Sequence, residues 1–211
     1  MSAATSRFDP PQAMPFGMSE VNALARHTTW AHSAVTAWAG YGIGLFALLL
    51  LAGVWQGRRT SARTLAAAGW AGAGALFALS LNQPLVHLID EARPYERYPQ
   101  LLVLAHRSTD ASFPSDHAVI AGAVAAGLWL VDRRLGVVAS VAAVLMAFAR
   151  TYTAAHYPQD VLAGLVLGVV VVVLGWRLVG RRLTNLLESL ASTPLRPLLR
   201  AGAAGAGPAN G

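Results

Sequence analysis

The sequence contains no cysteine and no lysine, and only 12% of its 211 residues are charged. The lack of cysteine excludes a disulfide, a thiolate nucleophile and a cysteine-ligated metal. Soluble domains usually carry about a quarter charged residues, whereas 55% of this chain is hydrophobic. The composition therefore predicts an integral membrane protein with the bilayer as its main partner.

All sixteen basic residues are arginines, which gives the chain a formal net charge of +6. These arginines do not form a stripe with interleaved aromatic residues, so we expect no nucleic-acid partner. Half of them instead cluster at the ends of apolar runs, which indicates membrane topology. The clusters that do so are Arg58, Arg59 and Arg63; Arg133 and Arg134; and Arg177, Arg181 and Arg182.

A transmembrane helix needs about 20 mostly apolar residues. Five such runs predict an all-α fold, a polytopic membrane helical bundle: about Thr36 to Val54, Thr64 to Val86, Ser115 to Val131, Leu135 to Tyr152 and Pro158 to Val179. The segment 19–32 predicts an N-terminal helix that lies in the membrane interface.

The apolar runs suggest one domain with a tail at each end. We expect an N-terminal tail over 1–18, a membrane-embedded domain over 19–185, and a C-terminal tail over 186–211. The small-residue, low-complexity segment 201–211 is typical of disorder. The first twenty residues lack a basic start followed by an apolar core, so we expect no cleaved signal peptide.

If the five spans alternate, all three arginine clusters lie on one side of the membrane. The positive-inside rule makes that side cytoplasmic and places the C-terminus there. The loop 87–114 and the turn 153–157 are then extracytoplasmic. The expected location is therefore a plasma membrane, with the polar residues of these two segments facing outward.

One polar cluster lies at the start of the fifth apolar run and contains Arg150, His156 and Asp160. Residues four apart on a helix share a face, so Asp160 is expected to reach the ring of His156. A carboxylate on one ring nitrogen fixes the tautomer and leaves the other nitrogen nucleophilic. Each residue alone also fits a cap or a snorkelling side chain, but their combination favours catalysis.

A second cluster, within "SFPSDH" (112–117), begins the third apolar run. Ser115 is expected to cap that helix, whose free N–H groups form an anion site. His117 is placed to protonate a leaving oxygen, and the guanidinium groups of Arg93 and Arg150 match phosphate oxygens. Together these residues predict phosphoryl transfer without a metal or cofactor, although Asp90 and Glu91 offer an alternative site for a divalent ion.

These clusters resemble the three signatures of the type 2 phosphatidic acid phosphatase superfamily: Lys-x6-Arg-Pro, Pro-Ser-Gly-His and Ser-Arg-x5-His-x3-Asp. Here Ala149 stands in place of the serine of the third signature, and Asp116 in place of the glycine of the second. In the first signature, Arg93-Pro94 is present but Val86 occupies the lysine position. The string "SFPSDH" resembles the bacterial undecaprenyl-diphosphate phosphatase branch.

The resemblance implies a role for each matching residue. His156 is expected to form a phosphohistidine, with Asp160 orienting it and His117 acting as general acid and then activating water. The residues expected to hold the phosphate are Arg93, Ser115, Arg150 and, through its backbone N–H, Asp116. The accessory residues that we expect near the site, some of which compensate for the missing lysine, are His87, Arg97, His106, Arg107 and Asp110.

The sequence therefore predicts a metal-independent phosphatase that hydrolyses undecaprenyl diphosphate to the monophosphate at the outer leaflet. A second hypothesis within the superfamily is a phosphatase for phosphatidic acid, diacylglycerol diphosphate or phosphatidylglycerophosphate. An alternative from another class is a non-catalytic membrane protein that binds or transports lipid phosphates. The sequence does not indicate an oligomeric state.

Overall fold

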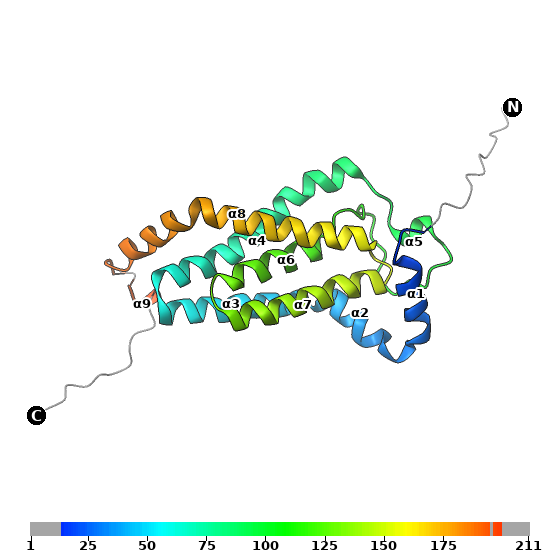
Figure 1. Cartoon of the computed structure of the whole chain (residues 1–211), viewed down its shortest axis with the longest axis horizontal. Coiled ribbons are helices and arrows are strands. Elements are labelled where there is room, and N and C mark those ends of the chain that lie inside the picture. Colours follow the sequence, from blue (N-terminus) through cyan, green and yellow to red (C-terminus); the bar gives the residue numbers. More distant parts are fainter. Residues whose placement is uncertain (1–13, 195, 200–211) are drawn as a thin grey trace, which may run out of the picture.

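The computed structural model describes residues 14–194 and 196–199, and within these residues it contains helices and no strand. The all-α prediction is therefore confirmed (Figure 1). The helices are α1 (Met18–His27), the 3-10 turn η1 (Thr29–Ala31), α2 (His32–Tyr41), α3 (Ile43–Thr60), α4 (Ala62–Ile89), α5 (Pro94–Arg97), α6 (Asp116–Trp129), α7 (Arg133–Tyr152), α8 (Pro158–Leu190) and α9 (Arg196–Leu199).

Each of the five predicted apolar runs corresponds to helical structure. Among the described residues, three helices are long and apolar enough to cross a membrane, or up to four if the bent pair η1–α2 and α3 counts as one span. The predicted first span is not one straight helix, because the chain bends by 53° between Tyr41 and Ile43. Gly42 occupies the break, where a Cβ atom would lie 2.7 Å from the Met146 side chain of α7.

Helix α6 is the central helix of the bundle and is only 14 residues long. It packs against α4, α7 and α8, and ten of its residues are buried. Small residues allow this close packing: a Cβ atom on Gly122 would lie 2.4 Å from the carbonyl oxygen of Leu165, and one on Gly168 would lie 2.2 Å from that of Val119. At about 21 Å, α6 is shorter than the predicted third span.

Helix α8 continues to Leu190, five residues beyond the predicted end of the domain at residue 185. Apolar residues recur along its extension with a helical period, at Leu183, Leu186, Leu187 and Leu190, which explains why the helix does not stop where the membrane-spanning run ends. The predicted disordered segment 201–211 lies outside the described residues, as does most of the predicted N-terminal tail.

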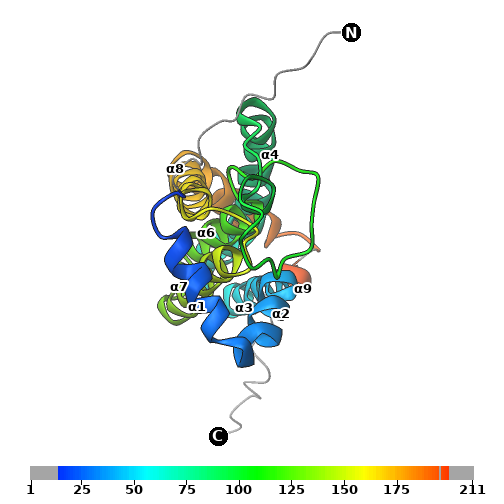
Figure 2. The same ribbon diagram turned by 90° about the vertical axis from the view of Figure 1, so that its right-hand side faces the viewer.

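Helix α1 lies across one end of the bundle, as Figures 1 and 2 show. The predicted interfacial segment 19–32 is not continuous, since α1 ends at His27 and η1 precedes α2. The side chain of Asn22 binds the backbone of Leu102 in both directions, at 2.9 and 3.1 Å. Met18 packs with Tyr98 and Tyr157 in a small apolar cluster. The helix thus fastens the loop between α5 and α6 to the turn between α7 and α8.

The polar clusters and the arginine clusters lie at opposite ends of the bundle (Figure 1). The α3–α4 and α6–α7 turns share one end with the C-terminal part of α8, and these segments carry the arginines. The loop from α4 to α6 and the turn from α7 to α8 lie at the other end. The predicted grouping of the three clusters at one end of the molecule is therefore present in the fold.

Candidate active site

The turn between α7 and α8 places His156 beside Arg150. Helix α7 ends at Tyr152, and Ala154 adopts a left-handed conformation with φ of 59°, a common way to terminate a helix. The carbonyl oxygen of Arg150 then accepts hydrogen bonds from the backbone N–H groups of Ala155 (3.0 Å) and His156 (3.2 Å). This closure brings the ring of His156 back toward the guanidinium of Arg150.

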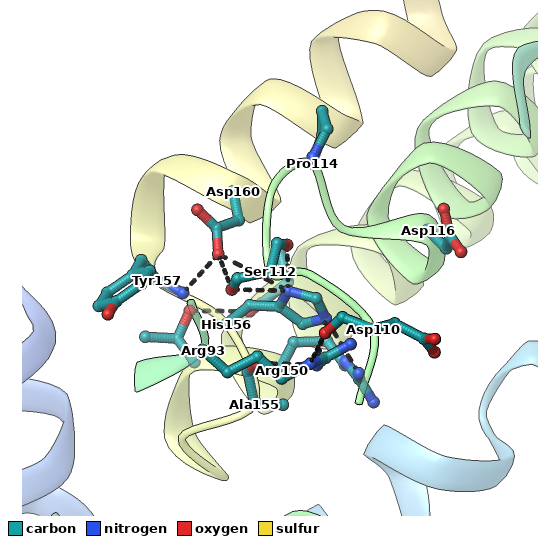
Figure 3. A network of polar contacts seen from close by, with 12 residues as sticks. Arg93, Asp110, Ser112, Pro114, Asp116, Arg150, Ala155, His156, Tyr157 and Asp160 are labelled. Atoms are coloured by element: carbon teal, nitrogen blue, oxygen red, sulfur yellow. Dashed lines mark hydrogen bonds and ion pairs between the residues drawn. The ribbon is translucent and has the colours of Figure 1, made fainter. Parts of the chain in front are cut away.

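Two guanidinium groups meet at the Nε2 atom of His156 (Figure 3). Arg150 Nη2 lies 3.0 Å and Arg93 Nη1 lies 3.4 Å from this nitrogen. Because both neighbours are donors without an acceptor atom, Nε2 is the unprotonated ring nitrogen. The lone pair that a nucleophile needs therefore faces the guanidinium groups of Arg93 and Arg150, the two arginines that the sequence predicts to bind phosphate.

The Nδ1 atom of His156 carries the ring proton and donates it to the carbonyl oxygen of Ser112 at 2.8 Å. Asp160 Oδ2 lies 3.6 Å from Nδ1, which is too long for a hydrogen bond. Asp160 thus reaches the ring of His156 as expected, at ion-pair distance, while the hydrogen bond from Nδ1 goes to Ser112. His156 precedes the first residue of α8, so its side chain does not lie on the helix face that carries Asp160.

The carboxylate of Asp160 instead organises the turn beneath the histidine. It accepts from the Ser112 hydroxyl at 2.5 Å and from the backbone N–H of Tyr157 at 2.9 Å. Asp160 and Ser112 are both fully buried. Asp160 thus also acts on the ring through Ser112. It holds the hydroxyl of Ser112, and the carbonyl oxygen of Ser112 accepts the hydrogen bond from Nδ1–H.

Burial lowers the pKa of His156 well below its ordinary value, and the positive charges of Arg150 and Arg93 lower it further. Only 3% of the residue is exposed. A protonated imidazole would have to share this small space with two guanidinium groups, which is unfavourable. The ring is therefore neutral at physiological pH and keeps its lone pair.

Arg93 is held rigidly by the loop that follows α4. Its Nε atom donates to the carbonyl oxygen of Asp110 at 2.8 Å, and Nη1 donates to that of Ala155 at 3.1 Å. Arg150 Nη1 donates to the carbonyl oxygen of Ala39 at 3.3 Å, while its Nε is buried without a partner among the described residues. Both arginines therefore approach the histidine from fixed backbone positions.

Ser115 and Asp116 differ from what the sequence predicts. Ser115 is at the N-cap position of α6, but its hydroxyl makes no cap bond and is buried without a partner among the described residues. The Asp116 carboxylate lies apart from His156 (Figure 3). It accepts from Asn82 at 2.7 Å and from Gln83 at 3.1 Å, both on α4. The side chain that replaces the signature glycine therefore joins α4 to α6.

A cavity of about 500 Å³ opens at this end of the bundle. Its lining includes Arg93, His117, Arg150 and His156, so the structure brings the predicted catalytic histidines and phosphate-binding arginines together around one space. Val86, at the lysine position of the first signature, also lines the cavity and is almost fully buried.

The predicted accessory residues divide into two groups. His87, His106 and Asp110 line the cavity. Arg97 and Arg107 do not, and the guanidinium of Arg107 lies 5.4 Å from the centre of the Tyr95 ring. Sequence reasoning missed Ser112, Asn82 and Gln83. The polar pair Asn82-Gln83 within an apolar helix was a signal for the last two, whereas no sequence signal marks the carbonyl oxygen of Ser112.

The family model of the PAP2 superfamily matches residues 67–184, which include α6, α7 and most of α4 and α8. The chain belongs to the PAP2 superfamily. It is a membrane-embedded phosphatase of this superfamily that acts on lipid phosphates, so the alternative of a non-catalytic binding or transport protein is set aside.

Similar proteins carry related names. "Undecaprenyl-diphosphatase BcrC" of Bacillus subtilis (strain 168) is 29% identical over 72% of this chain and 76% of its own length. An "Undecaprenyl-diphosphatase" of Sulfolobus acidocaldarius is 31% identical over 44% of this chain and 46% of its own length. The chain thus spans less than half of this second relative.

Two solved structures share the fold of this PAP2 phosphatase. LpxE of Aquifex aeolicus matches with a TM-score of 0.58 and 21% identity, over 75% of this chain and 94% of its own. A phosphatidylglycerolphosphate phosphatase of Bacillus subtilis matches with a TM-score of 0.53 and 22% identity, over 74% and 82%. At these identities the likeness establishes the fold.

Proposed function

We propose that this PAP2 phosphatase hydrolyses undecaprenyl diphosphate to the monophosphate at the outer leaflet, through a phosphohistidine on His156. The observation that carries the proposal is the meeting of Arg93 and Arg150 at the Nε2 atom of His156. A phosphoryl group at this point accepts hydrogen bonds from both guanidinium groups while its phosphorus faces the ring nitrogen.

In the first step, the Nε2 lone pair attacks the terminal phosphorus and a P–N bond forms. The bond between this phosphorus and the bridging oxygen breaks, and the leaving lipid monophosphate takes a proton from His117. Arg93 and Arg150 stabilise the charge on the three equatorial oxygens. As the ring gains positive charge, its Nδ1–H remains bound to the Ser112 carbonyl oxygen.

In the second step, His117 takes a proton from a water molecule, whose oxygen attacks the phosphorus from the side of the departed lipid. The P–N bond breaks, inorganic phosphate leaves and the Nε2 lone pair is restored. His117 is suited to both steps because it lines the same cavity as His156. The cycle uses no metal. His117 donates one proton to the leaving lipid in the first step and regains one from water in the second.

Two lines of support favour a diphosphate substrate. The relatives from Bacillus subtilis and Sulfolobus acidocaldarius are named undecaprenyl-diphosphatases. In addition, the cavity extends past the nucleophile to His87 and His106, whose imidazoles meet the second phosphate in place of the missing lysine. Arg97 and Arg107 lie outside the cavity lining, so we assign them no contact with the substrate.

The position of the site supports action on a lipid at the membrane surface. The arginine-rich turns lie at the opposite end of the bundle, and the positive-inside rule places that end in the cytoplasm. The cavity then faces the outside, where a lipid anchored in the outer leaflet presents its diphosphate without leaving the bilayer.

The test is a phosphatase assay of the purified full-length protein with undecaprenyl diphosphate, phosphatidic acid and a soluble monoester. We expect kcat/KM to be highest for the diphosphate and negligible for the soluble ester. Equal or faster hydrolysis of phosphatidic acid would move the assignment to a phospholipid phosphatase. A substrate labelled with phosphorus-32 at its terminal phosphate should leave an acid-labile, base-stable label on the native protein and none on His156→Ala.

The role of His117 is tested by single-turnover kinetics with two leaving groups. A lipid monophosphate is a weaker base than an alkoxide, so its departure depends less on a proton donor. Loss of His117 should therefore slow formation of the phosphoenzyme more with phosphatidic acid than with the diphosphate. The same loss with both substrates would contradict proton donation by His117 in this step.

A further inference from the structure

A groove lies at the arginine-rich end of the bundle, away from the catalytic cavity. Its apolar part has a volume of about 580 Å³ and is lined by side chains of α3, α4 and α8, among them Val54, Ala66, Trp70, Val179 and Leu183. A polar cleft of about 340 Å³ is lined by the turn between α3 and α4, including Arg59 and Ser61.

The two parts form one continuous groove, because Arg58, Leu65, Leu187 and Leu199 line both of them. We call it the amphipathic groove. An apolar groove that ends in a cationic mouth has the polarity of a binding site for a lipid with a charged headgroup.

Arg58 is the central residue of the mouth. One nitrogen of its guanidinium, Nη2, donates to the carbonyl oxygen of Pro197 at 3.0 Å. Its Nε is buried and has no hydrogen-bond partner among the described residues. A buried charged donor without an acceptor is costly, and an anion in the polar cleft, which Arg58 lines, would offset this cost by pairing with the guanidinium.

The neighbouring residues add positive charge at the same level. The guanidinium of Arg59 lies 4.3 Å from the centre of the Trp55 ring, an arrangement that orients a cation above an exposed indole. Glu188 is the one acidic residue in the described lining of the polar cleft. The mouth is therefore net positive, which favours an anionic headgroup over a zwitterionic one.

The apolar part has room for an acyl chain beside α4. Gly69 lines it, and a Cβ atom added at Gly69 would meet no atom within 4 Å. A bulky side chain at this position would therefore project into the groove without clashing with the protein. A Cβ atom on Gly44 of α3 likewise meets nothing within 4 Å, and Gly44 does not line the groove.

We propose that the amphipathic groove binds an anionic glycerophospholipid, with its phosphate at Arg58 and Arg59 and an acyl chain between α4 and α8. This site is distinct from the catalytic cavity, which lies at the other end of the bundle. It couples the stability of the α3–α4–α8 junction to the lipid composition of the leaflet that surrounds it.

The experiment uses the full-length protein in a neutral detergent. Short-chain phosphatidylglycerol, phosphatidylcholine and inorganic phosphate are titrated separately while native mass spectrometry and the thermal unfolding midpoint are recorded. We expect retained phosphatidylglycerol and a raised midpoint, with little effect of the other two. An equal response to phosphatidylcholine would overturn headgroup selection, and an equal shift with inorganic phosphate that Arg58→Gln abolishes would overturn lipid binding in favour of a simple anion site.

Variants test the polar cleft and the apolar part of the groove separately. Arg58→Gln should weaken phosphatidylglycerol binding about tenfold, roughly 1.4 kcal/mol, and Arg58→Lys should retain much of it. Gly69→Leu should block the acyl chain, whereas Gly44→Leu and Arg134→Gln serve as matched controls that bind normally. Normal binding by Gly69→Leu would overturn the proposal, as would displacement of phosphatidylglycerol by an equimolar prenyl phosphate.

Discussion

The hydroxyl group of Ser112 donates to the carboxylate of Asp160 at 2.5 Å, and both residues are fully buried. The carbonyl oxygen of the same serine accepts a hydrogen bond from Nδ1–H of His156 at 2.8 Å. Ser112 therefore connects the carboxylate to the imidazole, through its side chain on one side and its backbone on the other. Ser112 lies in the loop before α6. His156 lies in the turn between α7 and α8, and Asp160 lies in the first turn of α8.

Ser112→Ala should lower kcat about 10- to 100-fold, because a buried carboxylate would lose a hydrogen bond of roughly 1.5 to 3 kcal/mol. The KM should change little, since Ser112 lies behind the ring and outside the described cavity lining. The measurement is steady-state kinetics, with thermal unfolding to confirm the fold. A raised KM with unchanged kcat would contradict a role in positioning His156.

The lowered pKa of His156 predicts a specific pH response. Below about pH 6.5, the unfolded histidine binds a proton while the folded, buried ring does not, so the free energy of unfolding should fall as the pH decreases. Arg93→Gln removes one nearby positive charge and should raise the pKa of His156 toward its ordinary value. Arg93→Lys keeps the charge and should leave the pKa low.

Histidine side-chain NMR of selectively labelled protein, with the His156 signal assigned through His156→Gln, follows this titration directly. An unchanged His156 pKa in Arg93→Gln would show that burial alone sets it. His156→Gln also serves as a control for the stability measurement. Its free energy of unfolding should depend less on pH than that of the native protein, in the range between the folded-state and unfolded-state pKa values of His156.

The hydrogen bonds between α4 and α6 predict that removing the side-chain amide of Asn82 lowers the free energy of unfolding more than removing that of Gln83. Asn82 is fully buried and donates to both Asp116 and the carbonyl oxygen of Pro114. Gln83 is exposed and donates to Asp116 alone. Asn82→Ala should therefore lower the unfolding free energy by about 1 to 3 kcal/mol, and Gln83→Ala by much less. Similar losses from both would contradict the buried link.

Sidedness is tested with single cysteines, which can be introduced cleanly because the chain has none. Arg107 is exposed at the site end and Arg134 is exposed at the opposite end. Arg107→Cys should react with an impermeant maleimide in intact cells, whereas Arg134→Cys should react only after lysis. The reverse result would place the active site in the cytoplasm.

Helix packing predicts contrasting effects of alanine at two glycines. Gly168→Ala would place a Cβ atom 2.2 Å from the backbone of α6, so we expect a loss of about 1 to 3 kcal/mol or more. Gly69→Ala meets no atom within 4 Å and should be neutral or slightly stabilising, since alanine favours a helix. The thermal unfolding midpoints of both variants provide the comparison.

The sequence predicts much of this fold because membrane helices depend on local apolar length. Helix α8 begins at the predicted residue, Pro158, and α7 begins at Arg133, two residues before the predicted start at Leu135. The bend at Gly42 was not predicted, and the close approach of Met146 to this position comes from α7, which is distant in the sequence.

The site residues could be predicted by type but not by their partners. The spacing of His156 and Asp160 suggested a direct bond on one helix face. Helix periodicity applies only from Pro158 onward, so the histidine was free to turn toward a carbonyl group of another loop. The contact of Asp116 with α4 likewise depends on tertiary packing, which a single sequence does not specify.

Under the proposed function, the short length of α6 would set the depth at which the chemistry occurs. A helix of about 21 Å falls roughly 9 Å short of a hydrocarbon layer of about 30 Å. With its C-terminal end at one boundary, its N-terminal end, and His117 with it, lies beneath the opposite headgroups. A substrate would have to sink its phosphates below the surface, into a region where water is scarce and each guanidinium attracts them more strongly.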